Sequence, residues 1–156
     1  MSNGKIVITR SAKGTKFLGK KIAQGIIEQG PADRAFVLAL QGDLGSGKTT
    51  FLQGFAEGLG VKDKITSPTF VLMKKFMVYG LKFKAFYHID CYRLQKPEEI
   101  LELGWPEIIA NPQNIVAIEW PEKIKKFLPQ RTARLGFKFI SKSQRKIKFG
   151  KAEFLC

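Results

Sequence analysis

Residues 42–49 constrain this chain more than any other feature. Their sequence, Gly-Asp-Leu-Gly-Ser-Gly-Lys-Thr, matches the phosphate-binding loop pattern G-x-x-x-x-G-K-[ST] at every fixed position. Such a loop works only between a buried strand and a helix, because its N–H groups must converge on an anion at the positive end of the helix. Residues 35–40 form an apolar run of strand length, and residues 50–60 read as a helix that ends at glycine. The pattern therefore predicts strand, loop and helix in that order, and a bound nucleoside triphosphate.

The residue types in this loop suit a triphosphate. Gly42, Gly45 and Gly47 allow backbone conformations that a Cβ would penalise, and they let the chain lie close to the phosphates. Lys48 is expected to reach the β- and γ-phosphates as a point charge. The hydroxyl of Thr49 is expected to bind Mg²⁺, a hard cation that prefers oxygen and shares its shell among phosphates, waters and few protein groups.

Two carboxylates stand at the ends of short apolar segments. Residues 114–119 close on Glu119, and residues 86–90 close on Asp90. A carboxylate at the carboxyl edge of a sheet can meet the metal shell of a bound nucleotide. A strand-terminal acid is also common as an ordinary loop residue. The presence of two such acids beside a phosphate-binding loop favours a role in the site.

Length and composition predict a single α/β domain that spans residues 1–156. The chain has 156 residues and lacks any run of 18 apolar residues, and its start does not resemble a secretory signal. We therefore expect a cytoplasmic protein without a membrane segment. Cys91 and Cys156 form no metal-ligand pattern and are expected to be reduced thiols.

The net charge is strongly positive, with 27 Lys and Arg against 13 Asp and Glu and a formal charge of +14. This balance favours acidic partners, RNA first among them, through long-range attraction. A lysine-rich surface can equally serve solubility. The basic residues are also scattered along the sequence, at residues 13–21, 123–126 and 138–151, and this scatter weakens the case for nucleic acid.

The remaining elements are short. We expect a helix capped by Ser11 or Thr15 that ends near Gly30, and a helix that starts at Pro97. The other expected elements are strands at 6–8, 70–73, 76–79 and 83–87, short helices after 105 and 121, and a terminal hairpin of 133–140 with 146–149. These segments are too brief for regular βαβ crossovers throughout. The predicted fold is therefore a reduced P-loop NTPase fold, with a mixed central sheet flanked by helices and a C-terminal β-hairpin.

Four segments occur together in an order that resembles the TsaE (YjeE) family. They read GDLGSGKTTF at 42–51, SPTF at 67–70, HIDCYRL at 88–94 and IEWP at 118–121. The resemblance covers roughly residues 11–121. It implies the bacterial ATPase subunit of the machinery that builds threonylcarbamoyladenosine next to the anticodon of tRNA. Such a protein binds ATP and Mg²⁺, hydrolyses ATP slowly, and works with the TsaD and TsaB subunits, so that hydrolysis resets the complex. Whether it contacts tRNA directly or only indirectly, through these subunits, stays open.

The resemblance also implies roles for individual residues. Thr49 and Glu119 complete the metal shell, Asp90 orients water or metal, and Thr69 is a switch residue that senses the γ-phosphate. The division of roles between Asp90 and Glu119 stays open. The implied nucleotide contacts are Ser11, Asp43, Leu44, Gly45, Ser46, Gly47, Lys48, Thr49 and Thr50.

Several neighbouring residues stay open. Cys91 replaces the leucine usual in this family, and a buried thiol can substitute for an apolar side chain at small loss. Trp120 is either a nucleotide-side or a packing residue. Tyr92 and Arg93 either hold the strand end or contact a partner subunit, and His88 is interpreted as a structural histidine.

Three rival functions remain to be weighed. A small-molecule kinase would use Asp90 as a base, but no arginine-rich lid is visible in the sequence. A GTPase would need an [NT]-K-x-D motif, which the chain lacks. An RNA-binding module would keep the loop only as structure, and Lys48→Ala would then lower RNA affinity without ATP.

Overall fold

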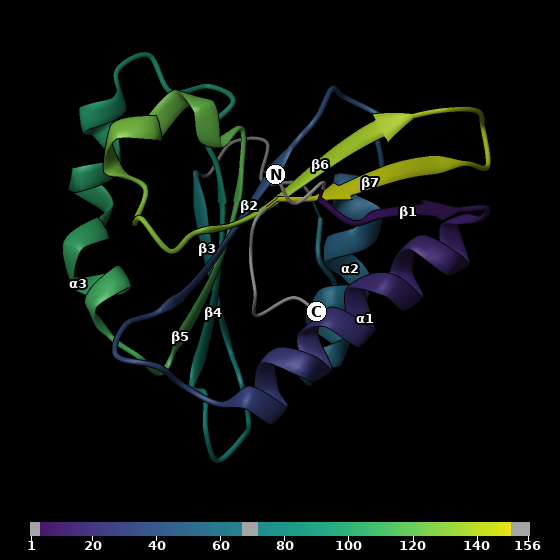
Figure 1. The fold of residues 1–156 in the computed structure, drawn as a ribbon. Coiled ribbons are helices and arrows are strands. Elements are labelled where there is room, and N and C mark those ends of the chain that lie inside the picture. The colour runs from purple at the N-terminus through teal and green to yellow at the C-terminus, as the bar shows by residue number, and fades with distance from the viewer. Residues whose placement is uncertain (1–3, 67–71, 151–156) are drawn as a thin grey trace.

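A computed structural model describes residues 4–66 and 72–150. Within these residues, seven strands form one sheet in the order β1-β7-β6-β2-β5-β4-β3 (Figure 1). The strands are β1 (Ile6–Thr9), β2 (Phe36–Gln41), β3 (Met73–Met77), β4 (Ala85–Asp90), β5 (Asn114–Glu119), β6 (Ala133–Phe139) and β7 (Arg145–Phe149). The helical elements are α1 (Ala12–Gln29), α2 (Lys48–Gly58), η1 (Pro97–Leu103), α3 (Trp105–Ala110) and η2 (Pro121–Phe127).

The sheet is parallel at its centre and antiparallel at both edges, as the sequence predicts. Strands β6, β2, β5 and β4 run parallel to one another, whereas β1–β7, β7–β6 and β4–β3 are antiparallel pairs. The carboxyl ends of the four parallel strands therefore meet at one edge. The phosphate-binding loop follows β2 at this edge, which is where a doubly wound sheet places its ligands.

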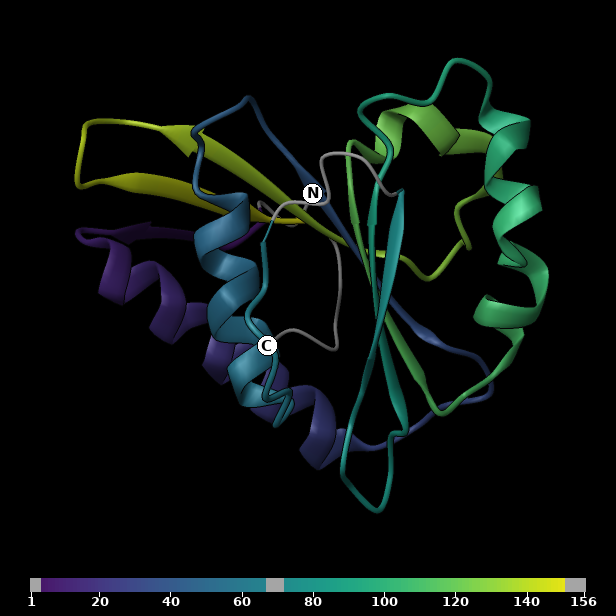
Figure 2. The ribbon, with the colours of Figure 1, turned by 180° about the vertical axis from the view of Figure 1, so that it is seen from behind.

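Helices α1 and α2 cover one face of the sheet, and α3 with the two 3₁₀ segments covers part of the other (Figures 1 and 2). The first layer buries Phe51, Phe55 and Phe86. The second layer buries Trp105, Ile118 and Ile124. The indole N–H of Trp105 donates to the carbonyl of Phe127 at 3.0 Å, so that α3 is tied to the end of η2.

Local sequence signals explain the ends of α1. The Ser11 hydroxyl accepts a hydrogen bond from the backbone N–H of Gly14 at 2.9 Å, which satisfies a free donor of the first turn. The helix ends at Gly30, whose φ of 78° is a conformation that glycine adopts without penalty. Both boundaries agree with the prediction from sequence. No helix in the described parts of the chain is long and apolar enough to cross a membrane.

Three details differ from the sequence-based expectations. Residues 97–103 form a 3₁₀ helix, in which Glu99 accepts hydrogen bonds from the backbone of Gln95 and Lys96. Strand β3 runs from Met73 to Met77 and so spans the break expected between strands at 70–73 and 76–79; residues 70 and 71 lie outside the described residues. The terminal hairpin is present as β6 and β7, and β1 adds a third strand to it.

Glycines set the close approach of α1 to α2. A Cβ on Gly54 would lie 1.8 Å from the carbonyl oxygen of Lys16, and one on Gly19 would lie 2.2 Å from that of Phe51. Both distances are far inside van der Waals contact with backbone, so the helices could not keep their separation. In contrast, a Cβ on Gly25 of α1 would meet nothing within 4 Å.

We predict that Gly54→Ala destabilises the protein although alanine is the better helix former. Because the Cβ would lie so close to backbone, the overpacking cost should reach about 3 kcal/mol or more, which exceeds the ~1 kcal/mol gained in helix propensity. Gly25→Ala is the matched control and should raise the free energy of unfolding by about 0.5–1 kcal/mol. Urea unfolding of both variants measures the difference, and equal shifts for the two would contradict the packing argument.

Candidate nucleotide site

The loop between β2 and α2 depends on glycine at three positions. Gly42, Gly45 and Gly47 have φ values of 153°, 78° and 105°, which side chains rarely allow. Two of these positions are crowded as well. A Cβ on Gly42 would lie 2.5 Å from the carbonyl oxygen of Phe137, and one on Gly47 would lie 3.2 Å from Cγ of Arg145. The backbone is thus held in a shape that only glycine can supply.

The loop just before α2 contains a buried hydroxyl that has no partner in the described part of the chain. Gly47 is the N-cap and provides no side-chain hydrogen bond to the helix. Ser46 is 1% exposed, and within the described residues its hydroxyl has no hydrogen-bond partner. Burial of an unpaired hydroxyl costs free energy, so such groups usually have a partner. An anion bound in the loop would supply that partner, and the residues present therefore fit a phosphate.

Lys48 is a buried cation in contact with the loop and with Trp120. Its ammonium group donates to the carbonyl of Gly42 and lies 4.4 Å from the centre of the Trp120 ring. Burial lowers the pKa of Lys48 below its ordinary value, and the carboxylates of Glu119 and Asp90 oppose this shift. The side chain thus stands between a loop that can receive phosphate and two acids.

Asp90 and Glu119 lie side by side at the carboxyl edge of the sheet, as predicted for the ends of parallel strands. They are register partners on β4 and β5, and Glu119 is also the partner of Leu40 on β2. Oδ1 of Asp90 accepts a hydrogen bond from the backbone N–H of Tyr92 at 2.9 Å. Burial raises the pKa of Asp90 above its ordinary value, and the Glu119 carboxylate adds to the increase.

His88 holds Glu119 in place, a role that sequence reasoning did not assign. Its Nε2 lies 2.7 Å from Oε2 of Glu119, and the two side chains are 0% and 4% exposed. His88 and Glu119 come from adjacent parallel strands. The sequence does contain one signal for this role: His88 stands two residues before Asp90, in a segment whose other residues before Asp90 are mostly apolar.

Trp120 both packs and contacts the site. Its φ of 58° is a left-handed conformation that is uncommon outside glycine. Its ring stacks at a tilt against Tyr92, with centroids 5.0 Å apart, and its face receives the Lys48 ammonium. The packing role left open by the sequence is therefore present, and a contact of Trp120 with nucleotide stays a prediction.

Arg145 is a second cation at the loop, and no sequence signal pointed to it. Its Nε lies 3.5 Å from the position that a Cβ of Gly47 would occupy. Within the described residues this buried Nε has no hydrogen-bond partner, whereas Nη1 donates to the carbonyls of Ser141 and Gln144. The contact arises because β7 folds back beside the loop, and local sequence patterns do not predict that arrangement.

The other predicted residues are placed as follows. Asp43 and Leu44 are exposed at the loop tip, and Thr49 and Thr50 are half-buried in the first turn of α2. Ser11 caps α1 two residues after Thr9, the register partner of Arg145. Thr69 lies outside the described residues. In residues 4–66 and 72–150, no cluster of three or more His, Cys, Asp or Glu is able to hold a metal by itself.

A cavity of about 400 Å³ lies at the opposite end of the sheet, around the start of β2. Gln29, Phe36 and Phe83 line it, and the exposed pair Arg131–Asp33, 3.8 Å apart, stands at its edge. It contains none of the predicted site residues. The glycine loop is the better candidate site. Among the described residues it has a buried hydroxyl without a partner, on Ser46, and the acids Asp90 and Glu119 lie near its Lys48.

Comparison with known proteins identifies the family of this chain. The sequence model of the family described as "Threonylcarbamoyl adenosine biosynthesis protein TsaE" matches residues 9–147. The chain belongs to the TsaE family. A TsaE relative in Bacillus subtilis is 39% identical over 124 residues, which are 77% of this chain and 75% of the relative. A TsaE relative in Treponema pallidum is 34% identical over 140 residues, which are 90% of this chain and 96% of the relative.

A solved structure confirms the fold. The crystal structure of YdiB from Bacillus subtilis superposes with a TM-score of 0.72 at 33% identity, over 100% of this chain and 93% of YdiB. The proteins that share the TsaE name are described as tRNA threonylcarbamoyladenosine biosynthesis proteins. Membership in the TsaE family thus connects the chain to this modification of tRNA.

We predict that Asp90→Asn stabilises the ligand-free protein at neutral pH. A carboxylate with a raised pKa is destabilising when ionised; this penalty is complete above the folded pKa and disappears as pH falls toward the unfolded value of about 3.9. The variant should therefore melt higher than the parent at pH 7.5, with a difference that shrinks on acidification. Asp63→Asn, at an exposed position, is the control. A lower melting temperature for Asp90→Asn at pH 7.5 would contradict the prediction.

Proposed function

We propose that this chain binds Mg²⁺ and ATP and hydrolyses ATP as a subunit of the tRNA threonylcarbamoyladenosine machinery. One observation carries the proposal: the glycine loop contains a buried Ser46 hydroxyl without a partner among the described residues, next to a partly desolvated Lys48 at the start of α2. Guanine specificity has no support in the sequence, which lacks an [NT]-K-x-D motif. Adenine is therefore the proposed base.

Phosphate binding is assigned to the loop and to Lys48. The N–H groups of the first turn of α2 have no side-chain cap and are free to point at an anion. Lys48 would exchange the carbonyl of Gly42 for phosphate oxygen, a stronger partner because both groups are charged. The further contacts proposed are Ser11, Asp43, Leu44 and Thr50, with Arg145 added because its guanidinium lies against Gly47.

Metal binding is assigned to Thr49 and Glu119. Mg²⁺ would neutralise charge on the triphosphate and is commonly held by one or two protein oxygens together with phosphates. Glu119 suits this role because it is buried at the sheet edge and one of its oxygens, Oε2, is already engaged by His88. The other oxygen, Oε1, is therefore left for the metal.

Asp90 is proposed to orient the attacking water. Its Oδ1 is engaged by the N–H of Tyr92, so Oδ2 is the oxygen available to a water molecule. The raised pKa of Asp90 makes the carboxylate a better proton acceptor than an exposed aspartate. Thr69 remains the proposed γ-phosphate sensor.

We also propose that the partners are TsaD and TsaB, and that hydrolysis resets the complex between turnovers. Tyr92 supports a role at the interface, because it is 48% exposed beside Trp120 and so links the site to the protein surface. Tyr92 packs against Trp120, and Trp120 contacts Lys48. A movement of Lys48 or Trp120 would therefore shift Tyr92 and change its contact with a partner.

We predict separate effects for the two halves of the site. Lys48→Ala and Thr49→Ala should weaken Mg·ATP binding by about tenfold or more, because each removes a phosphate or metal contact. Glu119→Ala and Asp90→Ala should mainly lower turnover, by about 10²–10³-fold, which is typical when a group that acts on the transition state is removed.

Calorimetry with Mg·ATP, a phosphate-release assay with TsaD and TsaB, and gel filtration of that mixture test these effects. Lys64→Ala, an exposed lysine far from the loop in sequence, is the control. Unchanged binding and turnover in all four variants would refute the proposed function. Binding without any turnover would leave a nucleotide-binding protein that is not an ATPase.

We predict that His88 positions Glu119 for the metal. His88→Phe keeps a ring but removes the donor to Glu119, whereas His88→Gln keeps a donor. Loss of such an outer partner typically lowers metal affinity 10–100-fold. The Mg²⁺ concentration needed for half-maximal ATP binding should therefore rise in the Phe variant and be partly restored in the Gln variant. ATP affinity in EDTA should be equal in both, and an equal Mg²⁺ requirement would refute this role.

A further inference from the structure

The positive charge of this protein is divided unequally along the chain. Residues 4–27 carry six Lys or Arg and no acid, and residues 123–150 carry ten and no acid. Between them, residues 28–122 carry ten Lys or Arg against twelve Asp or Glu. The whole excess of positive charge in the described residues therefore comes from residues 4–27 and 123–150.

The fold brings these two segments together. Strand β1 pairs with β7, and β7 pairs with β6, so three adjacent strands of the sheet come from the acid-free segments. Helix α1 follows β1 on the same side of the molecule (Figure 1). Cations that are far apart in the sequence, on β6 and β7, therefore lie in the same part of the sheet as β1, although the lysines of α1 and η2 belong to other elements.

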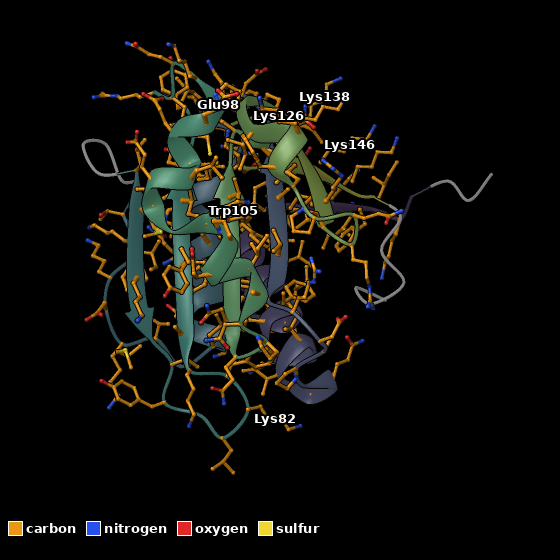
Figure 3. All side chains as sticks on the ribbon, turned by 90° about the vertical axis from the view of Figure 1, so that its left-hand side faces the viewer. Lys82, Glu98, Trp105, Lys126, Lys138 and Lys146 are labelled. Atoms are coloured by element: carbon orange, nitrogen blue, oxygen red, sulfur yellow. The ribbon has the colours of Figure 1, made fainter. Side chains whose placement is uncertain are left out.

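One face of these strands carries four of the cations. Lys138 is the register partner of Lys146, and Lys148 is the partner of Gly136. Since register partners point to the same side of a sheet, Arg134, Lys138, Lys146 and Lys148 share one face. We call these four residues the basic sheet face. Figure 3 shows Lys138 and Lys146 close together, at the end of the molecule opposite Lys82.

In the described part of the chain, Arg134, Lys138 and Lys148 of the basic sheet face are exposed and Lys146 is half-buried. The alternating residues Leu135, Phe137 and Ile147 point to the other side and pack in the core against α1 and α2. The core beneath α3 and the two 3₁₀ segments contains no residue of β1, β6 or β7. Ile6 and Ile8, the partners of Lys148 and Lys146, are each 49% exposed on the same face.

Within residues 4–66 and 72–150, no carboxylate compensates the charge on this face by an ion pair. Like charges directly opposite on paired strands are destabilising, as for Lys138 and Lys146. In the described part of the chain, none of the four cations forms an ion pair with a carboxylate, although Lys126 pairs with Glu98 nearby (Figure 3). A negatively charged ligand would relieve the repulsion.

Gly136 leaves part of the backbone accessible on the basic sheet face. A Cβ there would meet only the carbonyl oxygen of Lys148, at 3.9 Å, which is ordinary contact. Neither packing nor a positive φ requires glycine at this position. The missing side chain leaves backbone between the cations open to close approach by a ligand.

We propose that the basic sheet face binds the phosphate backbone of RNA, with tRNA as the biological ligand. A row of cations at alternate strand positions suits a polymer with regularly spaced negative charge, and exposed isoleucines can contact sugar or base surfaces. RNA is favoured over an acidic protein because the family acts in modification of tRNA. The inference rests on family membership and does not require ATP hydrolysis.

The test is a binding titration of a fluorescently labelled, unmodified tRNA transcript, followed by anisotropy at several salt concentrations. The triple variant Lys138→Gln, Lys146→Gln, Lys148→Gln should bind about tenfold or more weakly at low salt. Its slope of log affinity against log salt should be shallower by about 0.7–0.9 for each phosphate that the protein no longer neutralises.

The matched control is Lys62→Gln, Lys64→Gln, Lys74→Gln, which removes the same charge from exposed positions elsewhere. It should change affinity by less than about threefold. Lys48→Ala should leave RNA affinity unchanged and impair only ATP binding, so failure of one proposal can be told from failure of the other. Equal weakening by the two triple variants, no tRNA binding by the parent, or tighter binding of a polyglutamate peptide than of tRNA would each overturn the inference.

Discussion

The site depends on a cation kept largely out of water. Lys48 lies between the carbonyl of Gly42, the face of Trp120 and the acids at the ends of β4 and β5. Each of these groups compensates part of the desolvation of an ammonium ion. The arrangement explains why the sheet is parallel at this point, because only parallel neighbours place Asp90 and Glu119 at the edge from which the loop departs.

Several parts of the molecule position the groups that surround Lys48. Glycines at the crossing of α1 and α2 let α2 lie close to its neighbour and so set the direction in which the loop enters the helix. His88, which lies buried on the neighbouring strand β4, holds Glu119 through the contact between its Nε2 and Oε2 of Glu119. The side chain of Arg145, on β7, packs against Gly47. The position of a few polar atoms thus depends on packing that extends over most of the described chain.

Sequence reasoning succeeded where the signal was local. The glycine loop, the Ser11 cap, the terminal glycine of α1 and strand β5 are each encoded in a few consecutive residues, and the structure has all of them. The meeting of Asp90 with Glu119 was also accessible, because parallel strands align their carboxyl ends.

What sequence reasoning missed arises from pairing between distant segments. His88 and Arg145 reach the site only through neighbouring strands, and the basic sheet face exists only after β1, β7 and β6 have paired. The 3₁₀ form of residues 97–103 was missed for another reason. Proline and acids mark the start of a helical segment but do not decide between its two hydrogen-bonding patterns.

The pairing of β1 with β7 has a consequence for how the protein is made. Thr9 and Arg145 are neighbours in space, yet most of the polypeptide is synthesised between them. During translation β1 must therefore remain without its strand partner until residues 145–148 have left the ribosome. Contacts of such long sequence separation form late and slowly. Because Arg145 belongs to the same strand, it reaches the loop only in this closing step, and before that step a nascent chain would lack this cation beside Gly47.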